Sequence, residues 1–472
     1  MKTFLTHSYL YQLDPKQWKN RTPYPPLGTI TALAVLEQIQ KDVQFYDIAL
    51  DPSTQNCIQA MQKYQPDVVV IYEDSFNYLT KMCLTNMRYA CFELLKAAKA
   101  IGAKTIVSSS DATDHFKLYH ENGANIILHG EGEQSLKACI QAFEHNSSFQ
   151  EIQGISFNHD GEISKNLPRQ NVKDIDELPT AKWSAIHLNE YQKIWESGKY
   201  PFTLNISTTR GCPFKCNWCA KPIYGNRYNS RSPERVVEEI ELLVKKTGVS
   251  NFWITDDIFG LKPGWVHQFR QLIEAKQLTI RYKIQSRADL LLTETNIEDL
   301  AASGLDEVWI GAESGSQKIL DAMDKGISLE EIKKATQLLK ANGVRVAYFL
   351  QFGYLGETAD DIRATFTMVK ENQPDDIGIS VSYPLPGTKF FDTVKEQMGS
   401  KSNWEDSDDL SLMFRGTYDS AFYKKLQRFV HHSFRTKQGL EKWQQPSKRI
   451  SWRYALLVPY NFALSKLLKP KF

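Results

Sequence analysis

Three closely spaced cysteines are the clearest candidates for chemistry in this sequence. Cys212, Cys216 and Cys219 stand in the segment RGCPFKCNWC, shortly after the apolar run TLNISTT. With seven cysteines in 472 residues, chance alone gives about 0.0015 occurrences of this fixed spacing. Thiolates are ligands for soft metals, and Gly211 and Pro213 favour a tight loop that brings the three sulfurs together. The segment is therefore predicted to bind a metal or a metal cluster.

The number of ligands separates the two main kinds of thiolate site. A structural zinc site normally takes four protein ligands, whereas three thiolates on a [4Fe-4S] cluster leave one iron open to a substrate or cofactor. A non-catalytic protein that binds zinc or carries a cluster is the alternative interpretation. Three cysteines without a nearby fourth favour a reactive cluster.

The motif and its surroundings resemble the radical S-adenosylmethionine (SAM) superfamily. Cys212, Cys216 and Cys219, with Trp218 before the last cysteine, match its three-cysteine signature. The resemblance covers about residues 205–395 and follows the order of motifs in the group of the anaerobic magnesium-protoporphyrin IX monomethyl ester cyclase. The segments that carry it are RYNSRSPERVVEEI, WITDDIF, SRAD, GAESGSQKILDAMDKG, GYLGET and YPLPGT. These matches are specific for the superfamily and weak for the substrate.

The resemblance implies cofactors and a class of reaction. In that superfamily the open iron binds the amino and carboxylate groups of SAM, and one electron cleaves SAM to methionine and a 5′-deoxyadenosyl radical. The expected cofactors are a [4Fe-4S] cluster and SAM. An electron donor such as flavodoxin or ferredoxin and a small-molecule substrate are the expected partners. Methyl transfer and oxidative cyclisation are the two expected outcomes, and no general acid or base is assigned.

Two adjacent carboxylates are candidates for the SAM site. Asp256 and Asp257 follow the apolar run NFWI, so they are expected at the carboxyl end of a strand. The resemblance places this segment at the methionyl amino group of SAM and the backbone of Trp218 near the adenine. Since adjacent strand residues point to opposite faces, one of the two aspartates is expected to contact the ligand. An exposed turn or a helix cap is the alternative for the pair.

The ends of three further predicted strands carry the remaining candidates. Arg287 follows YKIQS, and its planar guanidinium suits two-point pairing with the methionyl carboxylate; a structural salt bridge is the alternative. The resemblance places Glu313 and Ser314 near the SAM ribose and methionine, with capping of the next helix as the alternative. Gly353, in FGYLGET, permits close approach of the main chain to a ligand, or a plain turn. In that segment Leu355 replaces a proline usual in the group.

The elements that must position these residues indicate an α/β protein. Residues 1–148 alternate short apolar runs with amphipathic stretches, which predicts a Rossmann-like domain with a parallel sheet covered on both faces. From 201 to 395 about six further βα units predict a partial or complete TIM-type barrel, whose site lies at the carboxyl ends of the strands. Residues 149–200, with a hairpin turned at Asp160-Gly161, are interpreted as a connector.

The N-terminal domain resembles the cobalamin-binding domain of B12-dependent radical SAM enzymes. PPLGTITALAVLEQI and HGEGEQSL carry this resemblance. Two features depart from it: His7 stands outside the Asp-x-His-x-x-Gly motif that supplies a cobalt ligand, and Ser108–Ser110 stand where relatives often have a glycine pair. Cobalamin binding therefore stays open, and His7 is expected to be a hydrogen-bonded polar residue. His129, Glu131 and Glu133 are expected to contact another domain or a lid rather than a metal.

Composition and charge fit a globular protein and name no ligand. The chain is 42% hydrophobic and 24% charged, and its length favours two or three domains with their own cores. Its net charge of +2 gives no reason to expect a nucleic-acid partner. With neither a signal-peptide pattern nor a run of about 18 apolar residues, a cytoplasmic protein without a transmembrane segment is expected.

The other four cysteines, Cys57, Cys83, Cys91 and Cys139, are scattered along the chain. Free cysteine behaves as a small buried hydrophobe, and unpaired thiols fit a reducing compartment. These four are therefore expected in the core.

Residues 396–472 are rich in aromatic and basic side chains and read as helices. We expect this region to cap the barrel by helix packing. Contact with a membrane surface is the alternative.

Overall fold

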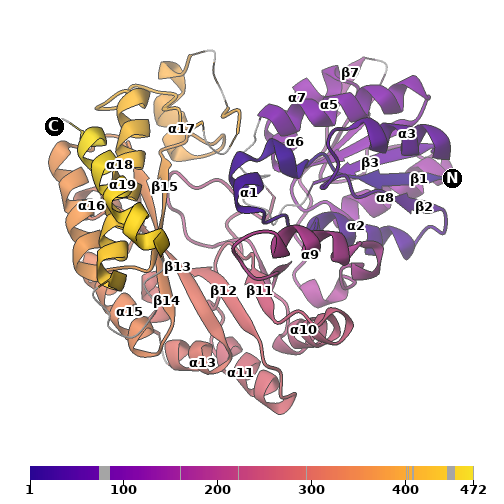
Figure 1. The fold of residues 1–472 in the computed structure, drawn as a ribbon. Helices are drawn as coiled ribbons and strands as arrows, with labels where there is room; N and C mark the ends of the chain where they lie inside the picture. The colour runs from indigo at the N-terminus through magenta and orange to yellow at the C-terminus, as the bar shows by residue number, and fades with distance from the viewer. Residues whose placement is uncertain are drawn as a thin grey trace.

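The computed structural model describes residues 1–73, 85–159, 161–221, 223–293, 295–399, 401, 403–406, 409–443 and 452–470. Two sheets form two neighbouring α/β bodies, and a pair of long helices lies on the far side of the second (Figure 1). The predicted class is confirmed: a Rossmann-like sheet, a barrel and a helical C-terminal region follow one another along the chain.

The first sheet has seven strands in the order β2-β1-β3-β4-β5-β6-β7. All neighbours from β2 to β5 are parallel. The order reverses between β1 and β3, and open α/β sheets bind ligands outside the carboxyl ends of their strands at such a switch point. The strands are β1 (Thr3–Thr6), β2 (Val43–Phe45), β3 (Val68–Tyr72), β4 (Lys104–Ser108), β5 (Ile126–Leu128), β6 (Ile155–His159) and β7 (Glu162–Lys165).

Helices cover both faces of this sheet because its central strands are apolar on both sides. All five residues of β3, VVVIY, are buried, as in strands that lie between two helix layers. Cys57, Cys91 and Cys139 are buried in these layers, as predicted, and Cys83 lies outside the described residues. The helices are α1 (Pro15–Asn20), α2 (Leu27–Glu37), α3 (Gln55–Tyr64), α5 (Thr85–Ala100), α6 (Ser110–Asp114), α7 (Phe116–Glu121) and α8 (Glu133–His145).

The β6–β7 hairpin extends the first sheet. β6 pairs antiparallel with β5, and its Ile155 and Phe157 alternate into the core between the sheet and α2 and α8. The sequence interpretation placed this hairpin in a connector, whereas the structure adds it to the N-terminal body. Its turn residue Asp160 lies outside the described residues, and the domain limits stay predictions.

Residues between the two bodies contact both of them. In α9 (Leu188–Glu196), the Tyr191 hydroxyl donates to Asp47 of the N-terminal body over 2.7 Å. The Trp183 indole donates to Glu239 of the barrel, also over 2.7 Å. This segment therefore ties the bodies together.

The second sheet has six parallel strands in the order β15-β14-β13-β12-β11-β8. In the described part of the chain β8 and β15 are its two edges, so the predicted barrel is a partial one. Alternate residues such as Phe252 and Ile254 of β11 are buried in the core, and the helices form an outer layer around the sheet (Figure 1). The strands are β8 (Leu204–Ile206), β11 (Asn251–Ile254), β12 (Arg281–Ser286), β13 (Leu305–Glu313), β14 (Arg345–Phe352) and β15 (Asp376–Val381). The helices are α10 (Pro233–Thr247), α11 (Trp265–Ala275), α12 (Ala288–Leu291), α13 (Asn296–Ala302), α14 (Gln317–Ala322), α15 (Leu329–Ala341), α16 (Ala359–Asn372) and α17 (Lys389–Val394).

Two helices of the C-terminal region, α18 (Ser420–Trp443) and α19 (Trp452–Leu468), lie beside β15 (Figure 1). Arg435 of α18 donates to Asp376 at the start of β15 over 2.7 Å. α19 packs on α18, where Nδ1 of His432 lies 2.7 Å from the side-chain oxygen of Asn461. Among the helices that the structure describes, none combines the length and apolar character needed to cross a bilayer.

Candidate active site at the carboxyl edge of the barrel

A short antiparallel ribbon pins the ends of the cysteine loop. β9 (Thr209–Arg210) pairs with β10 (Asn229–Ser230), so the intervening residues project from the carboxyl edge of the barrel. Gly211 begins the loop at a φ of 78°, and a Cβ there would lie 2.3 Å from the carbonyl oxygen of Arg227. Only glycine fits this position without a shift of the backbone.

The three predicted cluster ligands lie together on this loop and are half-buried. Burial raises the pKa of the Cys212 thiol, and it raises that of Cys219 to about 12. The charge of Cys216 adds to both shifts, so the sulfurs are close enough to interact. The thiolates therefore need a nearby positive charge, which a metal supplies.

The donor set fits an iron–sulfur cube. In the described residues no three His, Cys, Asp or Glu side chains are placed to hold a single metal ion. A [4Fe-4S] cluster instead takes each thiolate on a different iron, and three thiols leave one iron open. Cys212, Cys216 and Cys219 as its ligands stay a prediction that this chemistry supports.

Asn217 anchors the cysteine loop to the barrel. Its backbone N–H donates to Met323 (3.0 Å) and its side chain to Ala322 (2.6 Å), both at the end of α14. Its side-chain oxygen accepts from the Tyr354 hydroxyl (2.8 Å), and its carbonyl accepts from the backbone of Phe390 (3.0 Å). The backbone and side chain of one residue thus connect the loop to three segments of the barrel.

The Trp218 side chain packs in a small apolar cluster with Ile319, Tyr354 and Phe390. Its indole nitrogen is buried and has no hydrogen-bond partner among the described residues. The cluster fixes the loop beside α14 and α17. The predicted approach of the Trp218 backbone to the adenine of SAM stays a prediction.

The two adjacent aspartates, which follow β11, have different environments. Asp256 is buried and accepts from the backbone N–H groups of Thr208 (2.7 Å) and Thr209 (3.0 Å) and from the Thr208 hydroxyl. Burial raises the pKa of Asp256 to about 6. Asp257 is exposed, and its charge raises the pKa values of Cys212 and Cys219. Asp256 therefore holds the turn between β8 and β9, and Asp257 faces the cysteine loop.

Arg287 is buried and braces the cysteine loop. Its guanidinium pairs with Asp289 (3.0 Å) and donates to the carbonyl oxygens of Lys325 (2.8 Å) and Gly326 (3.1 Å). It stacks 3.8 Å from the ring of Phe214, which belongs to the loop. The structural salt bridge weighed as the alternative is therefore present, and contact with the SAM carboxylate stays a prediction.

Glu313 and Lys325 form a buried ion pair beside the cysteine loop, with 2.7 Å between the ammonium and the carboxylate. Burial lowers the pKa of Lys325, but the charges of Glu313 and Cys216 outweigh it and raise that pKa. Glu313 has a φ of 53°, a strained conformation for a non-glycine residue. Ser314 is fully buried, and its hydroxyl lies 3.3 Å from that of Thr365.

Gly353 directly follows β14 and has a φ of 79° in a tightly packed position. A Cβ there would lie 3.2 Å from the ring of Tyr423 in α18. Its N–H donates to Glu357 (2.7 Å), a fully buried carboxyl whose pKa burial raises to about 8. The C-terminal region thus reaches the carboxyl edge of the barrel through Tyr423.

The N-terminal domain also reaches the cysteine loop. Arg210, two residues before Cys212, donates to Glu133 over 2.6 Å and to Glu131. Burial alone lowers the pKa of Arg210, but the two carboxylates raise it. The expectation that Glu131 and Glu133 contact another domain is confirmed. For His129 this expectation is wrong, since its Nε2 lies 2.9 Å from the Ser156 hydroxyl within the N-terminal body.

The carboxyl edge of the first sheet is polar, and some of its buried polar atoms have no hydrogen-bond partner in the described residues. His7 is buried and contacts Asp47 over 3.0 Å, as expected for a hydrogen-bonded residue, but its Nδ1 has no partner in the described part of the chain. One carboxylate oxygen of Asp114 and one of Glu133 are also buried without a partner there. Ser109 caps α6 by accepting from Ala112. These buried polar atoms suit a ligand that carries many amide groups.

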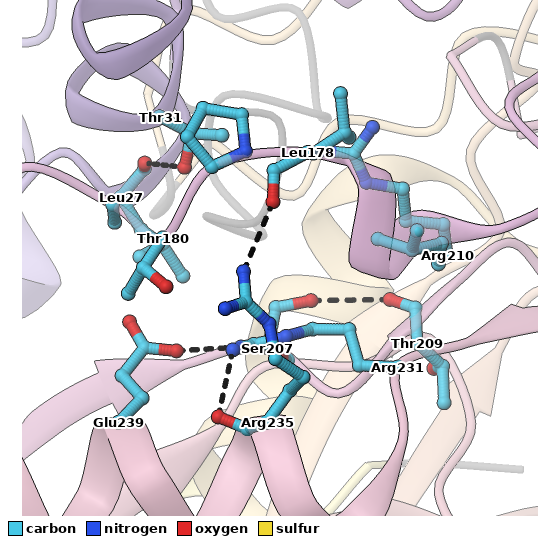
Figure 2. A pocket seen from close by; sticks show the side chains of 13 residues that line it. Leu27, Thr31, Leu178, Thr180, Ser207, Thr209, Arg210, Arg231, Arg235 and Glu239 are labelled. Carbon is cyan, nitrogen blue, oxygen red and sulfur yellow. Dashed lines mark hydrogen bonds and ion pairs between the residues drawn. The ribbon is translucent and has the colours of Figure 1, made fainter.

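A small cavity with a mixed polar and apolar lining lies between the N-terminal domain and the barrel (Figure 2). Its volume of about 40 Å³ admits water but not SAM. Arg231 donates to Glu239 (2.6 Å) and to the carbonyl of Ser207 (2.9 Å), and Arg235 donates to that of Leu178 (3.2 Å). Arg235 thus holds the connector against the barrel, whereas both of these Arg231 bonds lie within the barrel.

Sequence reasoning missed Arg210, Asn217, Lys325 and Tyr423. Arg210 and Asn217 stand next to the predicted ligands, so their position could have marked them. Lys325 and Tyr423 lie at least 100 residues from the cysteines along the chain. Lys325 stands in the segment GAESGSQKILDAMDKG, which carries the resemblance, but nothing there sets it apart from a surface lysine, and no local pattern distinguishes Tyr423 from a core tyrosine.

Residues 206–369 match the family model of the radical SAM superfamily. A protein of Pyrococcus horikoshii named as an uncharacterized methyltransferase is 24% identical over 89% of this chain and 93% of its own length. The anaerobic magnesium-protoporphyrin IX monomethyl ester cyclase of Cereibacter sphaeroides is 25% identical over 76% of this chain, which spans 58% of the cyclase.

A solved structure shares the fold. The cobalamin-dependent SAM radical enzyme OxsB, with aqua-cobalamin bound, is 17% identical and superposes with a TM-score of 0.76 over 99% of this chain and 72% of its own. Residues 206–369 therefore form a radical SAM domain, and the chain is an enzyme that carries this domain.

Proposed function

We propose that this enzyme cleaves SAM at a cluster held by Cys212, Cys216 and Cys219 and acts on a small molecule by methyl transfer or oxidative cyclisation. The observation that carries the proposal is the cysteine loop on the carboxyl edge of a six-stranded parallel barrel. The cluster, when bound, supplies the electron that breaks the sulfonium bond. The names of the methyltransferase and cyclase relatives support the two outcomes.

Asp257 and Arg287 are proposed to have different roles at the SAM site. Asp257 is proposed to bind the methionyl ammonium, since it is exposed beside the thiols while Asp256 is committed to the backbone of Thr208 and Thr209. Arg287, through Phe214, is proposed to keep the loop in place.

Glu313, Ser314 and Gly353 complete the proposed SAM site. They lie at the ends of β13 and β14, on the same edge of the barrel as the cysteine loop. The ion pair of Glu313 with Lys325 holds a positive charge close to Cys216. Such a charge stabilises thiolates and anionic groups of a ligand.

Cobalamin binding by the N-terminal domain is the second part of the proposal. The strand order of the first sheet, its buried polar atoms without partners and the likeness to OxsB support it. The residues that would hold it lie at the carboxyl edge and include Ser109 and Glu133. His7 is engaged by Asp47, so no histidine in the expected motif supplies a cobalt ligand. Bound corrin would serve as the methyl carrier.

A reducing compartment such as the cytoplasm, with flavodoxin or ferredoxin as electron donor, belongs to the same proposal. The free thiols of Cys57, Cys91 and Cys139 support the compartment.

Anaerobic reconstitution tests the function. The protein is loaded with iron and sulfide, reduced with dithionite and given SAM, with and without hydroxocobalamin. Formation of 5′-deoxyadenosine or S-adenosylhomocysteine is expected, and Cys216→Ala is expected to abolish it. One zinc per chain with no labile sulfide and no product would contradict the proposal.

A further inference from the structure

Positive charge is concentrated in residues 420–472, here called the basic segment. It holds 12 of the 57 Lys and Arg residues and one of the 55 Asp and Glu residues. The basic segment therefore carries +11 in a chain whose net charge is +2, and the other residues together carry −9. Such asymmetry indicates an anionic partner for this part of the molecule.

Large apolar side chains are exposed within the same segment. In α19, Tyr460 is 58% exposed, Phe462 52% and Leu467 74%. Among the described residues, three of the twelve exposed large apolar side chains thus fall within eight positions of one helix. Clusters of this kind on a surface mark an interaction site.

The two faces of α19 are distinct. Val458 and Ser465, seven positions apart, are buried on the side toward α18. A Cβ on Gly439 of α18 would lie 2.4 Å from Val458, so the two helices are in close contact. By helical spacing Tyr460 and Leu467 lie on the side opposite Val458, and Phe462 lies at the border of the buried stripe, one turn from Val458. Figure 1 shows α19 at the outside of the molecule, far from the N-terminal domain.

Lysines border the exposed apolar residues. Lys466 and Lys469 are exposed, and the Lys466 ammonium lies 5.3 Å from the centre of the Phe462 ring. Aromatic rings and long basic side chains place an apolar part in the acyl boundary of a bilayer and a polar end among the head groups. α19 carries no acidic residue that would oppose an anionic surface.

We propose that the exposed face of α19 docks on the surface of an anionic lipid bilayer. Tyr460, Phe462 and Leu467 enter the boundary between head groups and acyl chains, and Lys466 and Lys469 bind the head groups. Because α19 does not have the character of a spanning helix, it lies on the bilayer without crossing it. A purely charged partner such as nucleic acid leaves the three apolar side chains unexplained.

Vesicle co-sedimentation of the full chain tests the proposal. The protein is mixed with vesicles of phosphatidylcholine alone or with phosphatidylglycerol added, at low and high salt. Binding is expected only with phosphatidylglycerol, and high salt is expected to weaken it. The double variant Lys466→Glu, Lys469→Glu is expected to bind roughly 30-fold more weakly, at about 1 kcal/mol for each lost charge. Leu467→Ser is expected to weaken binding about tenfold.

Matched variants elsewhere separate docking from a general effect. Lys245→Glu reverses a highly exposed lysine of α10, and Leu167→Ser removes a 75% exposed leucine near the first sheet. Both are expected to bind vesicles like the wild type, and circular dichroism checks that every variant is folded. Equal binding to neutral vesicles, equal loss in the control variants, or a dimer that Leu467→Ser dissociates while vesicle binding is unchanged would overturn the proposal.

Discussion

Arg210 of the radical SAM domain donates to Glu133 of the N-terminal domain over 2.6 Å, two residues before the first cluster cysteine. Glu131 accepts from the same guanidinium, and all three side chains are about 5% exposed. The N-terminal domain thus holds the strand from which the cysteine loop begins. Placement of the cluster and docking of the two domains depend on one buried contact.

Removal of the Arg210 charge is expected to destabilise the protein strongly. Arg210→Ala leaves two carboxylates buried without their partner, at a cost of roughly 3–5 kcal/mol in the free energy of unfolding. Denaturant-induced unfolding of the wild type and the variant measures this loss in the free energy of unfolding. Arg363→Ala, which breaks an exposed pair with Asp360, is expected to change stability by less than about 0.5 kcal/mol. Similar losses in both variants would contradict the assignment of Arg210.

The two aspartates are expected to respond in opposite ways to loss of their charge. Asp256→Asn removes an acceptor of backbone N–H groups and is predicted to cost roughly 1–3 kcal/mol of stability. Asp257→Asn changes an exposed residue, so its stability is expected to stay within about 0.5 kcal/mol while SAM binds about tenfold more weakly. Unfolding curves and SAM titrations of the reduced cluster measure both. The reverse pattern would assign the ammonium to Asp256.

Gly211 is predicted to be essential for cluster assembly. In Gly211→Ala the new Cβ meets the carbonyl of Arg227, so the loop cannot close and iron incorporation is expected to fail. Gly225 has a similar φ of 69° but open space around it. Gly225→Ala therefore costs only the strain of about 1–2 kcal/mol and is expected to retain iron. The iron and labile sulfide bound per chain are measured in both variants. A Gly211→Ala protein with a full complement of iron and sulfide would disprove the steric argument.

Glu357 is expected to make stability depend on pH. Burial raises the pKa of its carboxyl to about 8, while in the unfolded chain it ionises near its ordinary value of 4.5. Between these values the folded state holds a proton that the unfolded state releases. Stability present at low pH is therefore lost as pH rises through this window, by roughly 1.4 kcal/mol per pH unit, and levels off above the folded pKa.

The variant Glu357→Gln isolates this effect. Its side chain stays neutral, so its stability relative to the wild type is expected to rise from pH 5 to about pH 8. Glu371→Gln changes an exposed glutamate of α16 and is the matched control. Unfolding midpoints at several pH values give the comparison. Parallel curves for wild type and Glu357→Gln would show that the carboxyl is ionised in the folded protein.

Local patterns were sufficient to predict the elements of this fold. The spacing of Cys212, Cys216 and Cys219 identified the loop, and the apolar runs identified the parallel strands. The pattern also predicted the hairpin near residue 160, but its partner strand depends on which edge of the first sheet is free. Likewise, alternation along the chain could not decide whether the barrel closes, because the two edge strands are far apart in sequence.

The contacts that build the site were mostly invisible in the sequence. Arg210 and Glu133 are 77 residues apart, and their pairing arises from the packing of two domains. Lys325 reaches Glu313 only because α14 turns back over the end of β13. The sequence marked Asp256 and Asp257 equally, and burial of one of them distinguishes their roles. Residue types near a strand end thus predict that a site is present, whereas the role of each residue depends on its tertiary contacts.

The electron paramagnetic resonance spectrum of the reduced, anaerobically reconstituted protein, recorded before and after addition of SAM, tests the central claim most directly. The account predicts a [4Fe-4S] signal that SAM shifts, that persists when the buried Cys139 is changed to serine and that is lost in Cys216→Ala. A protein without this signal, or a signal that neither SAM nor Cys216→Ala alters, would contradict it.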